Sequence, residues 1–529
     1  MLSQLPALRL LKKNTLAQHI LLISLLIFII FISLLWSDTQ SLIAHDEGLY
    51  AKRAKLILDS GDWLSPFPSP HHKTIGSYWA IAISLKLFGV NDWSSRLPSI
   101  IAGLIATLLF YLTASRYFKP LNSLTASLAL ISMPIYFQSL RTAGPDMVFV
   151  ALIMAQIYFL ISAKDLSCKS FRWKIFSFGV CVSLAFFVRS IVALIPLVSL
   201  LPLIFVLKYL RIKEFWIWAV SGLLLGSVPL LFSLLSVFGD HGYAGLISLV
   251  SFASRKADLS ESYLFSSFPF YFTRIVCLTF PAFVFLLPRI KSFRQIIFTS
   301  KHRISQIELN SLALLFPLIY FMALSCMGTK YYHYLTPLVP ILALNIARID
   351  LFPKRGKFEF ESNFALFMGA IYLLGACALY FKREVLLVAP FYFGFFALLL
   401  SSILCFGIFY CKSIYRLRIS PFALIFAFLM AQYLAIFALS ASGIIWNTNK
   451  ELKFLANAVN SDCSSGAYLY GLSSKDRTIL TFYLDDSYVL ESLSSLSAAP
   501  RRCLISKEAK KKAVLKSLHN DQISNFYFR

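Results

Sequence analysis

Long apolar segments recur along almost the whole of this 529-residue chain. Many run for roughly 18 residues or more, the length that a helix needs to cross a hydrocarbon layer of about 30 Å. The segments are continuously apolar, whereas the strands of a membrane barrel would alternate apolar and polar residues. With 58% hydrophobic and only 14% charged residues, the sequence predicts an all-α polytopic membrane protein.

We expect about thirteen transmembrane helices within residues 1–445. The expected spans are approximately 19–37, 97–118, 122–140, 144–163, 173–188, 190–207, 214–238, 269–288, 309–327, 333–348, 363–381, 390–410 and 420–442. The first span follows Arg9, Lys12 and Lys13. It is too long for the core of a secretory signal and lacks a small-residue cleavage site, so it is interpreted as a retained anchor.

Basic residues are distributed unevenly between the connections of these spans. They cluster in alternate connections, at 116–119, 164–174, 208–213, 289–303, 348–357 and 412–418. Because basic loops stay on the cytoplasmic side, we expect a multi-pass protein of the plasma (inner) membrane with a cytoplasmic amino terminus. The carboxy terminus and the loops 38–96 and 239–268 are then external. The net charge of +25 reflects this topology, and no contiguous basic face with interleaved aromatics suggests a nucleic-acid partner.

The tail, residues 446–529, changes in composition and predicts a small extracytoplasmic α/β domain. We expect helices at 450–460, 476–484 and 507–519, and strands at 467–472 and 503–506. Cys463 and Cys503 are the two cysteines expected on the outer side. They are candidates for a disulfide, and two free thiols are the alternative.

The external loop 38–96 carries the most informative polar cluster. Adjacent carboxylates, Asp46 and Glu47, precede a predicted helix, and Pro70-His71-His72-Lys73 follows later in the same loop. Asp46 and Glu47 are candidate catalytic residues, and Asp46 with His72 is a candidate site for a divalent metal ion of unknown identity. The alternatives are that Asp46 only caps the helix while Glu47 favours its dipole, and that the histidines are a solvated surface pair.

Further isolated polar residues occur at the outer ends of the spans. These are Arg141, Asp146, Arg189, Lys330, Tyr332 and Tyr334. Charges near hydrocarbon are costly unless they are paired or face water, so a shared polar cavity is expected; snorkelling anchors are the alternative for Arg189 and Lys330. Cations can neutralise a phosphate leaving group while a carboxylate deprotonates an attacking hydroxyl. No nucleotide-binding glycine motif is present, so the energy for a transfer must reside in the donor.

An ordered set of landmarks gives the chain a family resemblance. The landmarks are Asp46-Glu47-Gly48-Leu49-Tyr50-Ala51, Ser60-Gly61-Asp62-Trp63-Leu64, Tyr78-Trp79, Lys86-Leu87-Phe88-Gly89-Val90 and Ser95-Arg96-Leu97-Pro98-Ser99. Weaker matches are Arg141 to Met147, Lys330 to Pro340 and Thr481 to Leu484. With these, the chain resembles the GT-C superfamily, specifically the group of lipid A aminoarabinose transferases and protein O-mannosyltransferases.

The resemblance implies an inverting glycosyltransferase. Such an enzyme takes a sugar from undecaprenyl phosphate or another polyprenyl phosphate and gives it to a lipid, glycan or protein acceptor on the extracytoplasmic face. It places Asp46 near the acceptor or a metal, and Lys73 against the donor phosphate. Arg141 and Asp146 would form a second polar loop, and Arg141 and Lys330 would steer the phosphate together with Lys73. Lys330, Tyr332 and Tyr334 would line the phosphate and lipid side, with Tyr78 and Arg189 as further candidate substrate-binding residues.

Three departures from the family pattern stand out. His72 replaces a glutamate, Thr74 and Ile75 replace two prolines, and Arg189-Ser190 stands where the family usually has Lys-Gly.

The alternatives to this glycosyltransferase are a lipid-linked oligosaccharide polymerase or ligase, and a membrane transporter or flippase. A transporter should show paired inverted repeats and helices broken near the bilayer midplane.

Overall fold

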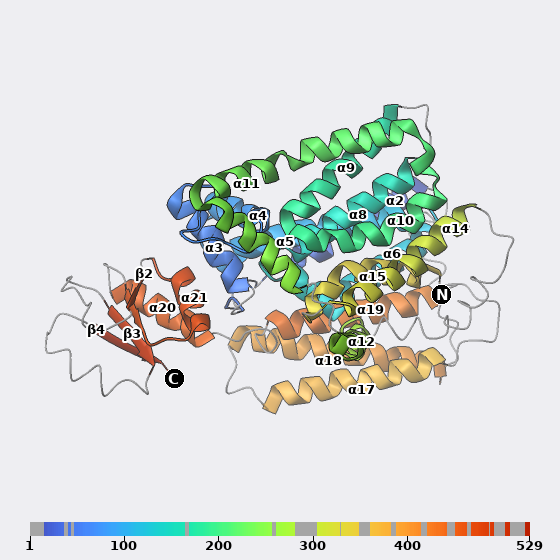
Figure 1. Ribbon diagram of the computed structural model, residues 1–529. Coiled ribbons are helices and arrows are strands. Elements are labelled where there is room, and N and C mark those ends of the chain that lie inside the picture. The colour runs from blue at the N-terminus through green and yellow to red at the C-terminus, as the bar shows by residue number, and fades with distance from the viewer. Residues whose placement is uncertain are drawn as a thin grey trace.

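The computed structural model shows a bundle of long helices with a small α/β module at one end (Figure 1). It describes residues 15–35, 37, 41–43, 47–163, 169–256, 261–280, 304–327, 330–348, 360–381, 388–413, 421–441, 450–462, 467–485, 487–490, 503–507 and 524–528. Asp46 and Cys463 lie outside the described residues.

The helical bundle follows the apolar segments of the sequence. Its helices are α2 (Thr15–Ile32), α5 (Asp92–Ala114), α6 (Pro120–Ser132), α7 (Pro134–Leu140), α8 (Asp146–Ser162), α9 (Lys169–Arg189), α10 (Leu194–Val206), α11 (Lys213–Lys256), α12 (Glu261–Leu278), α14 (Ile304–Asn310), α15 (Phe316–Ser325), α16 (Val339–Leu344), α17 (Phe360–Phe381), α18 (Val388–Ser413) and α19 (Pro421–Ala441). Each expected span overlaps at least one of them. In the described part of the chain, four helical segments are long and apolar enough to cross a membrane, and the bent pair α6 and α7 would make a fifth. The count of thirteen stays a prediction.

Prolines divide two of the expected spans. The helices α6 and α7 meet at a bend of 72°, where Pro134 begins α7. The expected helix over 333–348 is wrong as a single element, because Tyr332–Leu338 is a 3-10 helix and α16 begins only at Val339. Pro337 and Pro340 lie in this stretch, and proline lacks the amide hydrogen that a continuous helix needs.

The connection over 239–268, predicted as an external loop, is helical in most of its described residues, and its external position stays a prediction. Helix α11 continues to Lys256, and α12 begins at Glu261. The change of direction occurs inside α11 at Gly242, whose φ of 58° is non-helical and is tolerated because glycine has no Cβ.

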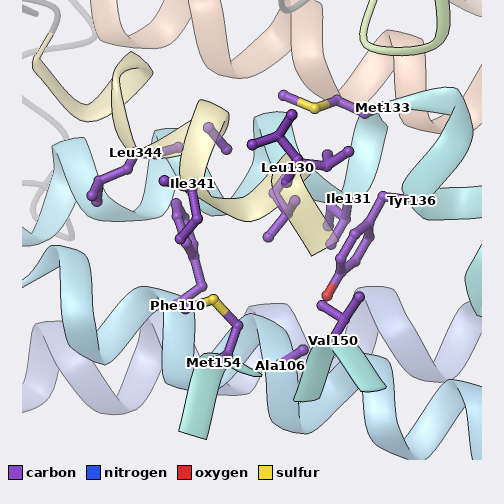
Figure 2. Packing of buried hydrophobic residues seen from close by; sticks show 14 of the residues in the cluster. Ala106, Phe110, Leu130, Ile131, Met133, Tyr136, Val150, Met154, Ile341 and Leu344 are labelled. Atoms are coloured by element: carbon purple, nitrogen blue, oxygen red, sulfur yellow. The ribbon is translucent and has the colours of Figure 1, made fainter. Parts of the chain in front are cut away.

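The main buried cluster joins α5, α6, α7, α8 and α16. Figure 2 shows Ala106, Phe110, Leu130, Ile131, Met133, Tyr136, Val150, Met154, Ile341 and Leu344 within it. In lipid, helices associate through close packing more than through the hydrophobic effect. Small residues permit this: a Cβ added to Gly179 on α9 would lie 2.1 Å from the Ala219 carbonyl oxygen on α11. These two helices therefore touch backbone to backbone.

The loop after the first span is structured, as predicted. It contains α3 (Glu47–Ser60) and α4 (Gly76–Phe88), which lie at the end of the bundle nearest the module in Figure 1. Asn91 ends the loop by capping α5, since its side chain accepts from the Ser94 amide and the Ser94 hydroxyl accepts from the Asn91 amide. A Cβ on Gly76 would lie 2.4 Å from Phe187 Cδ1, so α4 packs directly on α9.

The carboxy-terminal module contains a parallel four-stranded sheet. Its elements are α20 (Lys450–Asp462), β1 (Ala467–Tyr470), α21 (Ser474–Tyr483), β2 (Ser487–Leu490), β3 (Cys503–Lys507) and β4 (Ser524–Phe528), with strand order β2-β1-β3-β4. The sequence predicted α20, α21, β1 and β3, but missed the short strands β2 and β4. Lys507 ends β3, so it does not begin the helix expected at 507–519; residues 508–523 are outside the described part.

The module packs against α3. A shared apolar cluster includes Ala51, Ala54 and Ile57 from α3 and Ile479 from α21. The contact is close, because a Cβ on Gly48 would lie 2.5 Å from Ile479 Cδ1. Lys55 Nζ also donates to the Leu484 carbonyl at 2.7 Å.

Candidate active site

Glu47, at the first position of α3, forms a buried ion pair with Arg96 of α5. Arg96 Nε donates to Glu47 Oε1 at 2.7 Å, and Arg96 Nη2 donates to Oε2 at 2.9 Å. The Arg96 side chain is 1% exposed, and the Glu47 side chain is 0% exposed. Two parallel hydrogen bonds of this kind fix the relative position of both groups.

Both oxygens of Glu47 accept a second hydrogen bond. The Ala143 amide donates to Oε1 at 2.8 Å, and the Ile43 amide donates to Oε2 at 2.9 Å. Arg96 additionally donates to the carbonyls of Ser37 and Ser41. Glu47 was predicted as a catalytic residue, but a fully buried carboxylate with both oxygens engaged is suited to positioning. Through these bonds Glu47 joins the start of α3 to Ile43, Arg96 and Ala143. Asp46 immediately precedes Glu47 in the sequence.

Lys73 lies over the ring of Tyr50 and belongs to an aromatic network. Its Nζ donates to Tyr50 Oη at 3.0 Å and is 4.5 Å from the centre of that ring. The Tyr50 ring in turn lies 5.3 Å from the ring of Tyr78. Tyr78 was predicted to bind substrate; it is fully buried, and that role stays a prediction.

Tyr78 is held by two further groups. Arg53 Nη1 donates to Tyr78 Oη at 2.9 Å, and His71 Nε2 lies 2.9 Å from the same oxygen. Burial, and then the positive charge of Arg53, lowers the pKa of His71 to about 2. The ring is therefore neutral at physiological pH.

A small pocket brings three of the predicted site residues together. Its volume is about 40 Å³, and Lys73, His72 and Arg189 all line it. That volume accommodates a few water molecules or a small polar group. Tyr50 of α3 and Leu249 of α11 also line it, so the pocket lies between α3, α11 and the end of α9.

Arg189 connects this pocket to the second polar loop. It forms an ion pair with Asp146, and these side chains are 11% and 25% exposed. Its guanidinium also lies 6.0 Å from the ring of Tyr334. Asp146 is the first residue of α8, where a carboxylate also favours the helix dipole. The structure therefore joins Asp146, Arg189 and Tyr334, which the sequence predicted as separate members of one site.

The remaining predicted residues lie beside this group. Tyr332 is 38% exposed, and its hydroxyl accepts from Gln138 Nε2 at 3.1 Å. Lys330 is half-buried and precedes it by two residues.

Arg141 differs from its predicted role. It is 3% exposed and donates to the Ser33 carbonyl and to the Leu35 carbonyl, the latter at 3.0 Å. These carbonyls follow the end of α2, where a cation is stabilising. The prediction that Arg141 contacts substrate phosphate is not supported by this geometry; it caps α2.

The surroundings of His72 suit an anion better than a divalent cation. Lys73 and Arg189 line the same pocket, and cations of this kind repel a metal ion. Among the described residues, no group of three or more His, Cys, Asp and Glu side chains is arranged to hold a metal. The candidate metal pair of Asp46 and His72 stays a prediction, since Asp46 is outside the described part.

Sequence reasoning missed the roles of Arg53 and Arg96. Arg96 was part of a family landmark, and its signal was a charge at the start of an apolar segment, which must be paired. Arg53 had no comparable signal, because a basic residue on the polar face of an external helix is ordinary.

Comparisons with known proteins show which proteins this chain resembles in sequence. Residues 72–232 match the family described as dolichyl-phosphate-mannose-protein mannosyltransferase. An undecaprenyl phosphate-alpha-4-amino-4-deoxy-L-arabinose arabinosyl transferase of Aeromonas hydrophila is 29% identical over 210 residues, which are 38% of each chain. The transferase of the same name from Yersinia enterocolitica is 26% identical over 61% of this chain and 58% of its own. The chain thus matches less than two thirds of the length of these relatives.

The fold comparison covers nearly the whole chain. ArnT from Cupriavidus metallidurans, in its crystal structure bound to undecaprenyl phosphate, superposes with a TM-score of 0.67 at 16% identity, covering 96% of this chain and 89% of that one. Its apo structure gives a TM-score of 0.59 at 14% identity, covering 96% of this chain and 88% of that one.

The chain is a multi-pass membrane protein with the fold of the solved ArnT structures. Within that class the chain resembles the aminoarabinose transferases, and the resemblance predicted from the Asp46-to-Ser99 landmarks is confirmed.

Proposed function

We propose that this protein is an integral membrane glycosyltransferase that takes a sugar from an undecaprenyl-phosphate donor and gives it to an acceptor on the extracytoplasmic face. The observation that carries the proposal is the convergence of Lys73 and Arg189 on one small pocket. A phosphate bound there would accept charge-assisted hydrogen bonds from both side chains. The fold of a transferase bound to undecaprenyl phosphate and the similarity to aminoarabinose transferases support the choice of donor.

The proposed reaction is a single displacement. Asp46 takes the proton of the acceptor hydroxyl, whose oxygen attacks the anomeric carbon from the face opposite the phosphate. The bond between that carbon and the phosphate oxygen breaks, and undecaprenyl phosphate leaves with the bonding electrons. Lys73 and Arg189 stabilise the negative charge that develops on the leaving phosphate. One displacement inverts the anomeric configuration.

The remaining side chains support this step. The pair of Glu47 and Arg96 fixes the start of α3, immediately after Asp46. Asp146 orients Arg189 through their ion pair, and Tyr332, which is 38% exposed, would line the lipid side. We assign no step to a metal ion, because the described pocket is cationic.

The proposal includes the orientation of the protein. The uneven distribution of basic residues supports a cytoplasmic amino terminus, about thirteen spans and an external α/β module. The module packs on α3, so it shares the side of the membrane that holds the site.

Lipid binding to the purified protein tests the proposal. Undecaprenyl phosphate should bind, and undecaprenol, which lacks the phosphate, should bind at least tenfold more weakly. Lys73→Met should remove most of that difference. Lys213→Met, an exposed lysine at the start of α11, is the matched control and should retain it. Equal binding of both lipids by the unaltered protein would contradict a phosphate site.

A further inference from the structure

Tyr483, the last residue of α21, reaches from the carboxy-terminal module into the transmembrane part. Its hydroxyl donates to Asp92 Oδ1 at 2.6 Å and accepts from the Leu42 amide at 2.8 Å. One phenol therefore connects the module, the first residue of α5 and the segment 41–43. Burial, and then the carboxylate of Asp92, raises the pKa of Tyr483, so the hydroxyl keeps its proton and both bonds.

Asp92 receives a second bond from the same module. Lys453 of α20 forms an ion pair with its Oδ2. Asp92 is 3% exposed, and a buried carboxylate of this kind needs partners. Lys453 and Tyr483 both lie more than 360 positions from Asp92 in the chain.

The Asp92 contact lies next to the ion pair that fixes Glu47. Arg96 is one helical turn after Asp92 on α5 and donates to the carbonyl of Ser41, the residue before Leu42. The Ile43 carbonyl accepts from the Gly48 amide at 2.9 Å, while the Ile43 amide donates to Glu47. Residues 41–43 are thus held on one side by α3 and α5, and on the other by Tyr483.

We propose that Tyr483 is a positioning residue through which the carboxy-terminal module fixes residues 41–43, shortly before Asp46 in the sequence. The effect expected on kcat rests on the proposed function, whereas the effect expected on hydrogen exchange does not. Tyr483 touches neither donor nor acceptor. It fixes the backbone at Leu42, five residues before α3 begins. The module is then part of the catalytic apparatus, even though its sheet lies away from the pocket.

Hydrogen exchange of the full-length protein, measured by mass spectrometry in detergent, tests the inference. Tyr483→Phe removes one oxygen, and peptides covering 41–50 should exchange about tenfold faster. Peptides of β1 should be unchanged. Tyr158→Phe is the matched control, because the contact of Tyr158 with Arg116 uses the ring, and its exchange at 41–50 should equal that of the unaltered protein.

Kinetics provide the second measurement. In Tyr483→Phe, kcat for sugar transfer should fall about tenfold, while KM for the donor should not change, since Lys73 and Arg189 are untouched. A merely structural role would lower the active fraction and raise exchange along the whole chain. If the unaltered protein transfers no sugar, the proposed function fails, and the exchange experiment still decides this inference.

Lys453→Gln is a milder second variant, which decides the matter if Tyr483→Phe does not fold. It removes the ion pair to Asp92 and should raise exchange at 41–50 by a smaller factor. Unchanged exchange at 41–50 in both variants would overturn the inference.

Discussion

Arg96 and Glu47 are 49 residues apart in the chain, and they form a two-point ion pair in which neither side chain reaches solvent. The pair joins α5 to the start of α3. Because Asp46 immediately precedes Glu47 in the sequence, the pair also fixes one end of the segment that bears the proposed catalytic base.

Replacing one member of this pair should strongly destabilise the protein. Arg96→Met leaves the Glu47 carboxylate buried without its partner, which costs about 3–5 kcal/mol. Thermal unfolding in detergent measures the loss. Lys86→Met, an exposed lysine of α4, should change stability by less than about 1 kcal/mol. Equal melting temperatures for Arg96→Met and the unaltered protein would show that the ion pair does not hold the fold.

Asp46→Asn should abolish sugar transfer while leaving membrane insertion and folding intact, because an amide cannot take the acceptor proton at neutral pH. Glu47→Gln should instead lower the melting temperature, since it weakens the pair with Arg96. Transfer assays and unfolding curves on both variants separate the two roles. Full activity in Asp46→Asn would indicate that Asp46 only caps the helix.

The buried His71 should make the protein sensitive to acid. Its pKa is lowered to about 2 in the folded protein, against about 6.5 in an unfolded chain. Below about pH 6.5 the unfolded chain binds a proton that the folded protein does not bind. The free energy of unfolding therefore decreases as the pH is lowered. His71→Gln removes this titration.

From about pH 8 to about pH 5, the unaltered protein should therefore lose about 2 kcal/mol more than His71→Gln. Denaturant unfolding at the two pH values gives the comparison. The same loss in both proteins would assign the acid sensitivity to other groups.

A disulfide between Cys463 and Cys503 would close the carboxy-terminal module across residues that include β1 and α21. If it forms, the protein should migrate faster without reductant than with it on a denaturing gel. The double replacement by serine should abolish the difference. An unaltered protein with no shift would establish two free thiols.

The long apolar segments predicted the helices well, because hydropathy and length decide where a membrane chain is helical. The same reasoning failed over 333–348, where composition suits a span but Pro337 and Pro340 interrupt the hydrogen bonds. It also did not predict that α11 continues past Asp240 to Lys256, because the polar and glycine residues at 239–242 suggested a loop.

The site was predicted in part for a similar reason. Arg189, Asp146 and Tyr334 were identified as polar residues at the outer ends of spans. Lys73 was identified through the family resemblance, and the four residues do converge. Arg141 gave the same signal but turns toward the carbonyls after α2. The direction of a side chain depends on tertiary packing, so no local pattern separates an arginine that faces a pocket from one that caps a helix. The contact of Tyr483 with Asp92 spans 391 positions and is beyond such patterns altogether.

The central claim is transfer from an undecaprenyl-phosphate sugar, and mass spectrometry of membrane lipids tests it most directly. Cells that lack the protein should accumulate one undecaprenyl-phosphate sugar, together with an acceptor that is one sugar lighter. The unaltered protein should restore both, and Asp46→Asn should restore neither. Identical lipid and glycan profiles with and without the protein would contradict the account.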